Sequence, residues 1–175
     1  MNQSIVLTKQ LRKVAEKKKL NQKQIANLAF FAHTTTNGHF NGYPVPAESA
    51  MSYNELFNDS ELAFHLGQEF LGLIGLATGC KVKKDPLALV ALIGREERQR
   101  ERIEADKEIA CLMATPVDEW TNEQKEDLWQ YLNEYLDELL FENSLICKQL
   151  ELIDMSFMDL VKARMPQWKK QKWIE

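Results

Sequence analysis

The chain has 175 residues, 45% of them hydrophobic, and a formal net charge of -4. This length suits one compact domain, or a small domain with an extension, and the composition can supply a core. Three widely spaced cysteines, Cys80, Cys111 and Cys147, form no Cys-x-x-Cys pair, which argues against a zinc or dithiol site and fits a reducing compartment. No apolar stretch suits a signal peptide or a membrane span, so we expect a cytoplasmic protein without a membrane partner.

The sequence favours an all-α fold, because Leu, Glu, Lys, Gln and Ala are abundant and strand-like alternation is scarce. Apolar spacing and turn signals predict five helices in the N-terminal part. Asn21 is a good N-cap for the second, with Gln24 completing a capping box, and Pro46 suits the first turn of the fourth. The expected helices cover about residues 4–18, 22–29, 33–40, 46–57 and 60–78.

The C-terminal part has a different character after a linker at residues 80–86. Three more helices are expected, over about residues 86–113, 122–143 and 144–165, with Pro166 ending the last. The first is rich in alternating charges over residues 95–108, which is typical of a solvated helix with i, i+4 ion pairs. The chain is thus expected to divide into residues 1–79 and residues 80–175.

Catalysis and metal binding have little support in the sequence. The acids of residues 96–106 share helical spacing that a carboxylate metal site of an all-α hydrolase would use. Arginines are interleaved with them, however, which favours salt bridges over a cation cage. The histidines also lack metal-ligand spacing. We therefore expect no enzyme, no catalytic residues, no metal and no cofactor.

One face of the helix at residues 122–143 is apolar and suited to pairing with another helix. The aromatic residues of the C-terminal part are expected to form a second core, and this region also offers a dimer interface or a site for a regulatory protein or small effector. The residues predicted to form the dimer interface are Leu128, Leu132, Tyr135, Leu136 and Leu139.

Basic residues are concentrated at the other end of the chain. Residues 1–43 hold seven bases and one acid, a net charge of +6, so the remainder carries -10. A basic segment on an acidic body suggests that one end meets a polyanion. The alternative is that the lysines are only solvated residues on the outer face of a helix and bind no partner.

The segment at residues 22–46 has the pattern of a helix-turn-helix. Two short helices are joined by a tight turn, and the small Ala26 permits a close crossing. Such a pair projects its second helix outward, where short polar side chains reach base edges in a major groove. His33, Thr34 and Asn37 are predicted on that outward side, and Lys23 is a candidate phosphate contact because of its charge.

Over residues 11–56 the sequence resembles, without a gap, the lambda-repressor-like helix-turn-helix family, also called the Cro or xenobiotic-response-element type. The resemblance rests on "LRKVAEKKKLNQKQIANLA", on "FNG" at residues 40–42 and on Pro46. It implies a five-helix domain that binds double-stranded DNA, in regulators of bacteria and phages that usually bind as dimers. It further implies base contacts from Ala32, His33, Thr34 and Asn37, and backbone contacts from Gln22, Asn41 and Tyr43.

Three positions depart from the family pattern. Phe30 stands at a turn position where the family often has glycine, Thr36 replaces an aliphatic core residue, and Gly38 lies inside the recognition helix. We nevertheless expect a dimeric, sequence-specific transcriptional regulator of bacterial or phage type. The alternative is a helical adaptor or inhibitor whose degenerate helix-turn-helix grips another protein.

Overall fold

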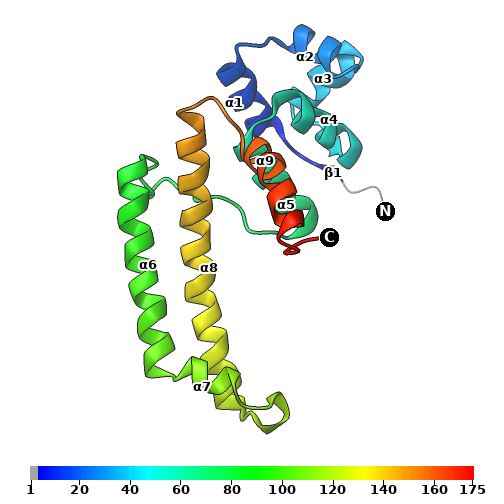
Figure 1. The fold of residues 1–175 in the computed structure, drawn as a ribbon. Coiled ribbons are helices and arrows are strands. Elements are labelled where there is room, and N and C mark those ends of the chain that lie inside the picture. The colour runs from blue at the N-terminus through cyan, green and yellow to red at the C-terminus, as the bar shows by residue number, and fades with distance from the viewer. Residues whose placement is uncertain (1–3) are drawn as a thin grey trace. The chain divides into compact units, whose positions relative to one another are not determined.

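The computed structural model describes residues 4–175, and these residues are mostly helical (Figure 1). The chain forms two compact units. We call the first the head unit; it comprises the residues up to Gly75 together with Ile153–Glu175. We call the second, Leu76–Leu152, the hairpin unit. This grouping differs from the expected division at residue 79, because the C-terminal segment folds with the N-terminal residues.

The N-terminal helices of the head unit close around one apolar core. Most core residues come from α1 (Thr8–Lys18), α2 (Gln22–Leu28), α3 (His33–Phe40), α4 (Ala47–Phe57) and α5 (Ser60–Leu71), whereas α9 (Phe157–Lys170) has no buried residue and lies outside this core. Leu11, Ile25, Tyr53 and Phe57 are at the centre of this core, and almost none of their surface is exposed. The starts of α2 at Gln22 and of α3 at His33 agree with the predictions. Asn21 and Gln24 form the expected capping box at the start of α2.

Two parts of the head unit differ from the predicted helices. The first helix begins at Thr8, because Ser4–Ile5 forms a short strand, β1, that pairs antiparallel with β2, Val45–Pro46. The fifth helix ends at Leu71 rather than near residue 78. Gly72 follows it with φ of 65°, a left-handed conformation that glycine adopts without strain and that ends the helix.

The C-terminal helix α9 is anchored to the junction between α4 and α5. The hydroxyl of Ser156, the N-cap of α9, lies 2.8 Å from the side-chain oxygen of Asn58, whose amide donates to Asp159 at 2.9 Å. The ring of Phe157 meets that of Phe64 edge to face. Pro166 lies inside α9, so the prediction that it ends the last helix is wrong.

The hairpin unit consists mainly of two long helices that lie side by side, α6 (Pro86–Asp106) and α8 (Asn122–Glu151) (Figure 1). Between them are α7 (Ile109–Met113) and a short 3-10 helix, Val117–Glu119. The predicted helix over residues 86–113 is broken at Glu108, whose φ is 48°. The predicted helices over residues 122–143 and 144–165 are also wrong in their boundary, because α8 continues through Ser144.

The aromatic residues of the C-terminal part do not form one core. Phe157 packs in the head unit, whereas Trp129 and Tyr135 lie on α8 in the hairpin unit and are exposed. The expectation of a single second core is therefore wrong. None of the helices in residues 4–175 has an apolar stretch long enough to cross a bilayer.

Candidate nucleic-acid interface

The entry to α2 is fixed by reciprocal hydrogen bonds. The amide of Gln24 donates to the Asn21 side chain at 2.9 Å, and the amide of Asn21 donates to the Gln24 side chain at 2.9 Å. Gln22 is the first residue of the helix and is partly exposed, whereas Lys23 is exposed. Two of the four predicted phosphate contacts therefore lie in the first turn of α2.

The turn between α2 and α3 folds back against Ala26, a buried residue of α2. The amide of Phe31 donates to the carbonyl of Ala26 at 2.9 Å, and the Phe31 ring packs against Tyr53 with the ring centroids 5.2 Å apart. Phe30 has φ of 57°, and 94% of its surface is exposed. The departure at Phe30 thus places a phenylalanine in a conformation that costs about 1 kcal/mol or more for a residue with a Cβ.

Helix α3 has one buried face and one exposed face. Thr36, His39 and Phe40 are buried and hold the helix against the core. Thr36 is thus buried at the position where the resemblance expects an aliphatic core residue. The predicted base-contacting residues are all exposed and lie together at the start of α3 and along its next turn; they are Ala32, His33, Thr34 and Asn37.

His39 connects α3 to α4. Its Nδ1 atom lies 2.9 Å from the hydroxyl of Tyr53, and the two rings meet edge to face. Burial lowers the pKa of His39 below its ordinary value, because an imidazolium would lose hydration in this position. The buried face of α3, opposite its exposed face, therefore carries a neutral imidazole at His39 beside the ring of Phe40.

Gly38 brings α3 close to the segment that follows it. A Cβ atom at this position would lie 2.9 Å from Cδ2 of Tyr43, so the glycine leaves room for the Tyr43 ring. The amide of Tyr43 also donates to the Gly38 carbonyl at 3.0 Å. Tyr43 is exposed and lies beside the C-terminal end of α3 together with Asn41, so these two predicted phosphate contacts are close to each other.

Arg12 also belongs to this surface, although it was not among the predicted contacts. Its Nε atom donates to the carbonyl of Phe40 at 3.1 Å, and its Nη2 atom donates to the side-chain oxygen of Asn41 at 3.1 Å. The side-chain nitrogen of Asn41 in turn donates to the side-chain oxygen of Asn37 at 2.9 Å. One signal was present in the sequence: Arg12 is the single arginine among the seven bases of residues 1–43.

Two of the N-terminal lysines are neutralised within the head unit. Lys13 pairs with Glu61 at 2.5 Å, and Lys17 pairs with Asp59 at 2.8 Å. Burial alone would raise the pKa of Asp59, but hydrogen bonds from Lys17 and the Leu62 amide, together with nearby lysine charge, hold it below its ordinary value. The basic character predicted for residues 1–43 is therefore only partly available to a partner.

The remaining charge of the head unit is still basic. Lys9, Lys19 and Lys23 are exposed and form no ion pair within residues 4–175. The two segments of the unit together contain 12 bases and nine acids, a net charge of +3, whereas the hairpin unit contains ten bases and 17 acids, a net charge of -7. The expected asymmetry of charge thus holds between the compact units as well.

The predicted dimerisation residues all lie on α8, but they differ in exposure. Leu132, Tyr135 and Leu136 are exposed, whereas Leu128 and Leu139 are partly buried. Tyr135 already stacks on Tyr131 with ring centroids 6.1 Å apart, and the Arg100 guanidinium lies 5.4 Å from its centroid. Tyr135 therefore belongs partly to the contact between α6 and α8.

An apolar stripe on α8 includes a residue that the prediction omitted. Trp129 is 60% exposed and precedes Leu132 and Leu136 at spacings of three and seven residues, which places these three side chains on one helix face. We call them the α8 stripe. The signal for Trp129 was its helical spacing to the leucines.

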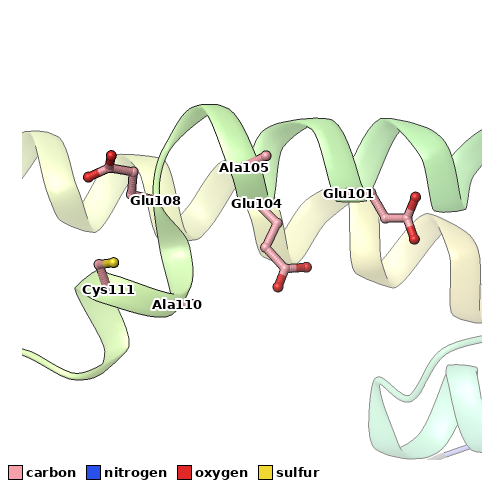
Figure 2. Close-up of a pocket in the computed structure, with 6 residues that line it drawn as sticks. All are labelled: Glu101, Glu104, Ala105, Glu108, Ala110 and Cys111. Atoms are coloured by element: carbon pink, nitrogen blue, oxygen red, sulfur yellow. The ribbon is translucent and has the colours of Figure 1, made fainter.

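Two acids of α6, Glu96 and Glu104, are paired with arginine. Arg100 bonds to Glu138 at 2.6 Å and to Glu104 at 3.1 Å, and Arg95 bonds to Glu96. An open hollow at the junction of α6 and α7 is lined by Glu101, Glu104, Ala105, Glu108, Ala110 and Cys111 (Figure 2). Within residues 4–175, no group of three or more His, Cys, Asp or Glu side chains is placed to hold a metal ion.

Comparisons with models of protein families, with curated proteins and with solved structures found no match to the chain.

Proposed function

We propose that the protein is a sequence-specific, double-stranded DNA-binding regulator that uses α2 and α3 as a helix-turn-helix. The observation that carries the proposal is the exposed face of α3. Its short polar side chains, His33, Thr34 and Asn37, point away from a core that is anchored through Thr36, His39 and Phe40. A helix with this division suits a major groove, where such side chains reach base edges.

Contacts that fix the register on DNA are available on both sides of this face. Gln22 and Lys23 lie at the N-terminus of α2, and Asn41 and Tyr43 lie at the C-terminal end of α3. Phosphate contacts of this kind position a recognition helix, whereas base contacts supply the discrimination. The net charge of +3 on the head unit supports attraction to a polyanion.

We further propose that the regulator is a homodimer joined through the α8 stripe. One short recognition helix offers few base contacts. A dimer has two such helices, which can read half-sites about 34 Å apart on one face of the duplex and so double the number of base contacts. Trp129, Leu132 and Leu136 supply apolar surface for such a contact. Bound dimers would act by occupancy of a site.

The salt dependence of binding tests the electrostatic part of this proposal. Fluorescence anisotropy with a labelled duplex should show that log K falls linearly with log salt concentration. Lys23→Gln should reduce the slope by about 1, because one phosphate contact is lost. Lys125→Gln, an exposed lysine of the hairpin unit, is the matched control and should leave the slope unchanged. Binding that does not respond to salt would contradict the proposal and favour the protein-binding adaptor.

A further inference from the structure

A directed chain of hydrogen bonds ends at a predicted base-contacting residue. It begins at Arg12 on α1, passes through the side chain of Asn41 and reaches the side chain of Asn37 on α3, with donor–acceptor distances of 3.1 Å and 2.9 Å. Arg12 is also fixed to α3 by its bond to the carbonyl of Phe40. The chain therefore links the framework of the head unit to its exposed face.

Arginine determines the direction of this chain. A guanidinium has N–H donors and no acceptor, so the group of Asn41 that faces Arg12 must be its carbonyl oxygen. The amide nitrogen of Asn41 then faces Asn37 and donates to it, so Asn37 accepts with its oxygen. The amide nitrogen of Asn37, with two N–H donors, remains available for a partner outside this chain of hydrogen bonds.

We propose that Arg12 is a positioning residue that holds the Asn37 amide with its nitrogen toward the base edge, so that Asn37 reads guanine. This inference rests on the proposed function. Guanine presents two acceptors in the major groove, N7 and O6, whereas adenine presents one acceptor and one donor. Because the oxygen of Asn37 faces Asn41, its N–H donors face outward, and this arrangement matches guanine better than adenine.

The test compares the sequence preferences of five forms of the full chain by selection from random duplexes. The wild type should enrich guanine at one position of each half-site, and Asn37→Ala should lose that preference. Arg12→Met and Asn41→Ala, which break the chain at different links, should lower the ratio of guanine to adenine at the same position by about fivefold or more. Lys9→Met, which removes an exposed charge from α1, should weaken binding to all sequences and keep the ratio.

A chemical substitution in the DNA tests which atom of the base Asn37 contacts. Guanine replaced by 7-deazaguanine at that position lacks the N7 acceptor and should weaken wild-type binding by about fivefold, with little effect on Asn37→Ala. Adenine preferred at the position, or a guanine preference that survives both Arg12→Met and Asn41→Ala, would overturn the inference.

A measurement without DNA separates this inference from the proposed function. In NMR spectra, Arg12→Met should shift the side-chain amide signals of both Asn41 and Asn37, whereas Lys9→Met should shift neither. An Asn37 signal that does not respond to Arg12→Met would overturn the positioning role whatever the DNA result. Shifted signals together with no enriched motif would leave the chain of hydrogen bonds intact and would overturn DNA reading.

Discussion

The Nδ1 atom of His39 lies 2.9 Å from the hydroxyl of Tyr53, and this contact joins the helix with the exposed polar face to the core of the head unit. Burial lowers the pKa of His39, so folding favours its neutral form. The unfolded chain therefore takes up a proton at higher pH than the folded head unit does, and stability must decrease as the pH falls below the ordinary histidine value of about 6.5.

We expect the amides of α3 and α4 to be less protected from hydrogen exchange at pH 5 than at pH 7, when protection is measured relative to the unfolded chain at the same pH. Hydrogen exchange of these two helices measures the effect, and His39→Gln should remove its pH dependence. The matched control is His65→Gln, which changes a histidine on α5. A pH dependence that persists in His39→Gln would show that another group is responsible.

The two lysine pairs of the head unit should contribute unequally. Asp59 is buried, accepts from Lys17 at 2.8 Å and caps α5 by accepting from the Leu62 amide at 3.0 Å. Asp59→Ala should lower the free energy of unfolding by about 2 kcal/mol, because it removes a cap and a charged hydrogen bond. Glu61→Ala, which removes the more exposed pair with Lys13, should cost less than about 1 kcal/mol. Equal losses in urea denaturation would contradict this difference in burial.

Phe30 should be a site where glycine stabilises the protein. Its φ of 57° is strained for a residue with a Cβ, and its exposed ring contributes little burial. Phe30→Gly should raise the free energy of unfolding by about 1 kcal/mol, whereas Phe30→Ala keeps the Cβ and should change it little. Chemical denaturation of the three forms checks this, and a destabilised Phe30→Gly would mean that the ring makes a stabilising contact.

The α8 stripe should control the mass of the protein in solution. Leu136 is 51% exposed, and Leu136→Glu should convert a dimer to a monomer because it places a charge within an apolar contact. Leu152→Glu changes a leucine of the hairpin unit that is 75% exposed, and the dimer should persist. Light scattering over a range of concentrations gives the mass. A wild-type monomer at all concentrations, or a dimer unaffected by Leu136→Glu, would contradict the proposed interface.

Local signals in the sequence were sufficient for the start of several helices. Asn21 and Gln24 cap α2 as predicted, and Asp85 with Pro86 begins α6. Such signals act within a few residues, because a cap satisfies N–H groups of the helix that it precedes. The polar outward positions of α3 could also be predicted from local sequence, because helical spacing alone separates them from Thr36 and Phe40.

Features that depend on distant contacts could not be predicted in this way. Strand β1 forms because Ile5 lies opposite Val45, far along the chain. Ser144 looked like a helix start, but its hydroxyl donates to the Leu140 carbonyl at 2.6 Å and accepts from the Ala77 amide at 2.9 Å, so α8 continues through it. The bond between Arg12 and Asn41 likewise depends on the packing of α1 against α3.

Base recognition by α3 is tested most directly by selection of random duplexes with the purified full chain, carried out in parallel with Asn37→Ala and Asn27→Ala. Asn27 is an exposed asparagine of α2 outside the predicted contacts. We expect that the wild type and Asn27→Ala enrich the same two-fold symmetric motif, and that Asn37→Ala loses preference at one position of each half-site. No enriched motif for the wild type, or a motif that Asn37→Ala leaves unchanged, would contradict base recognition by α3.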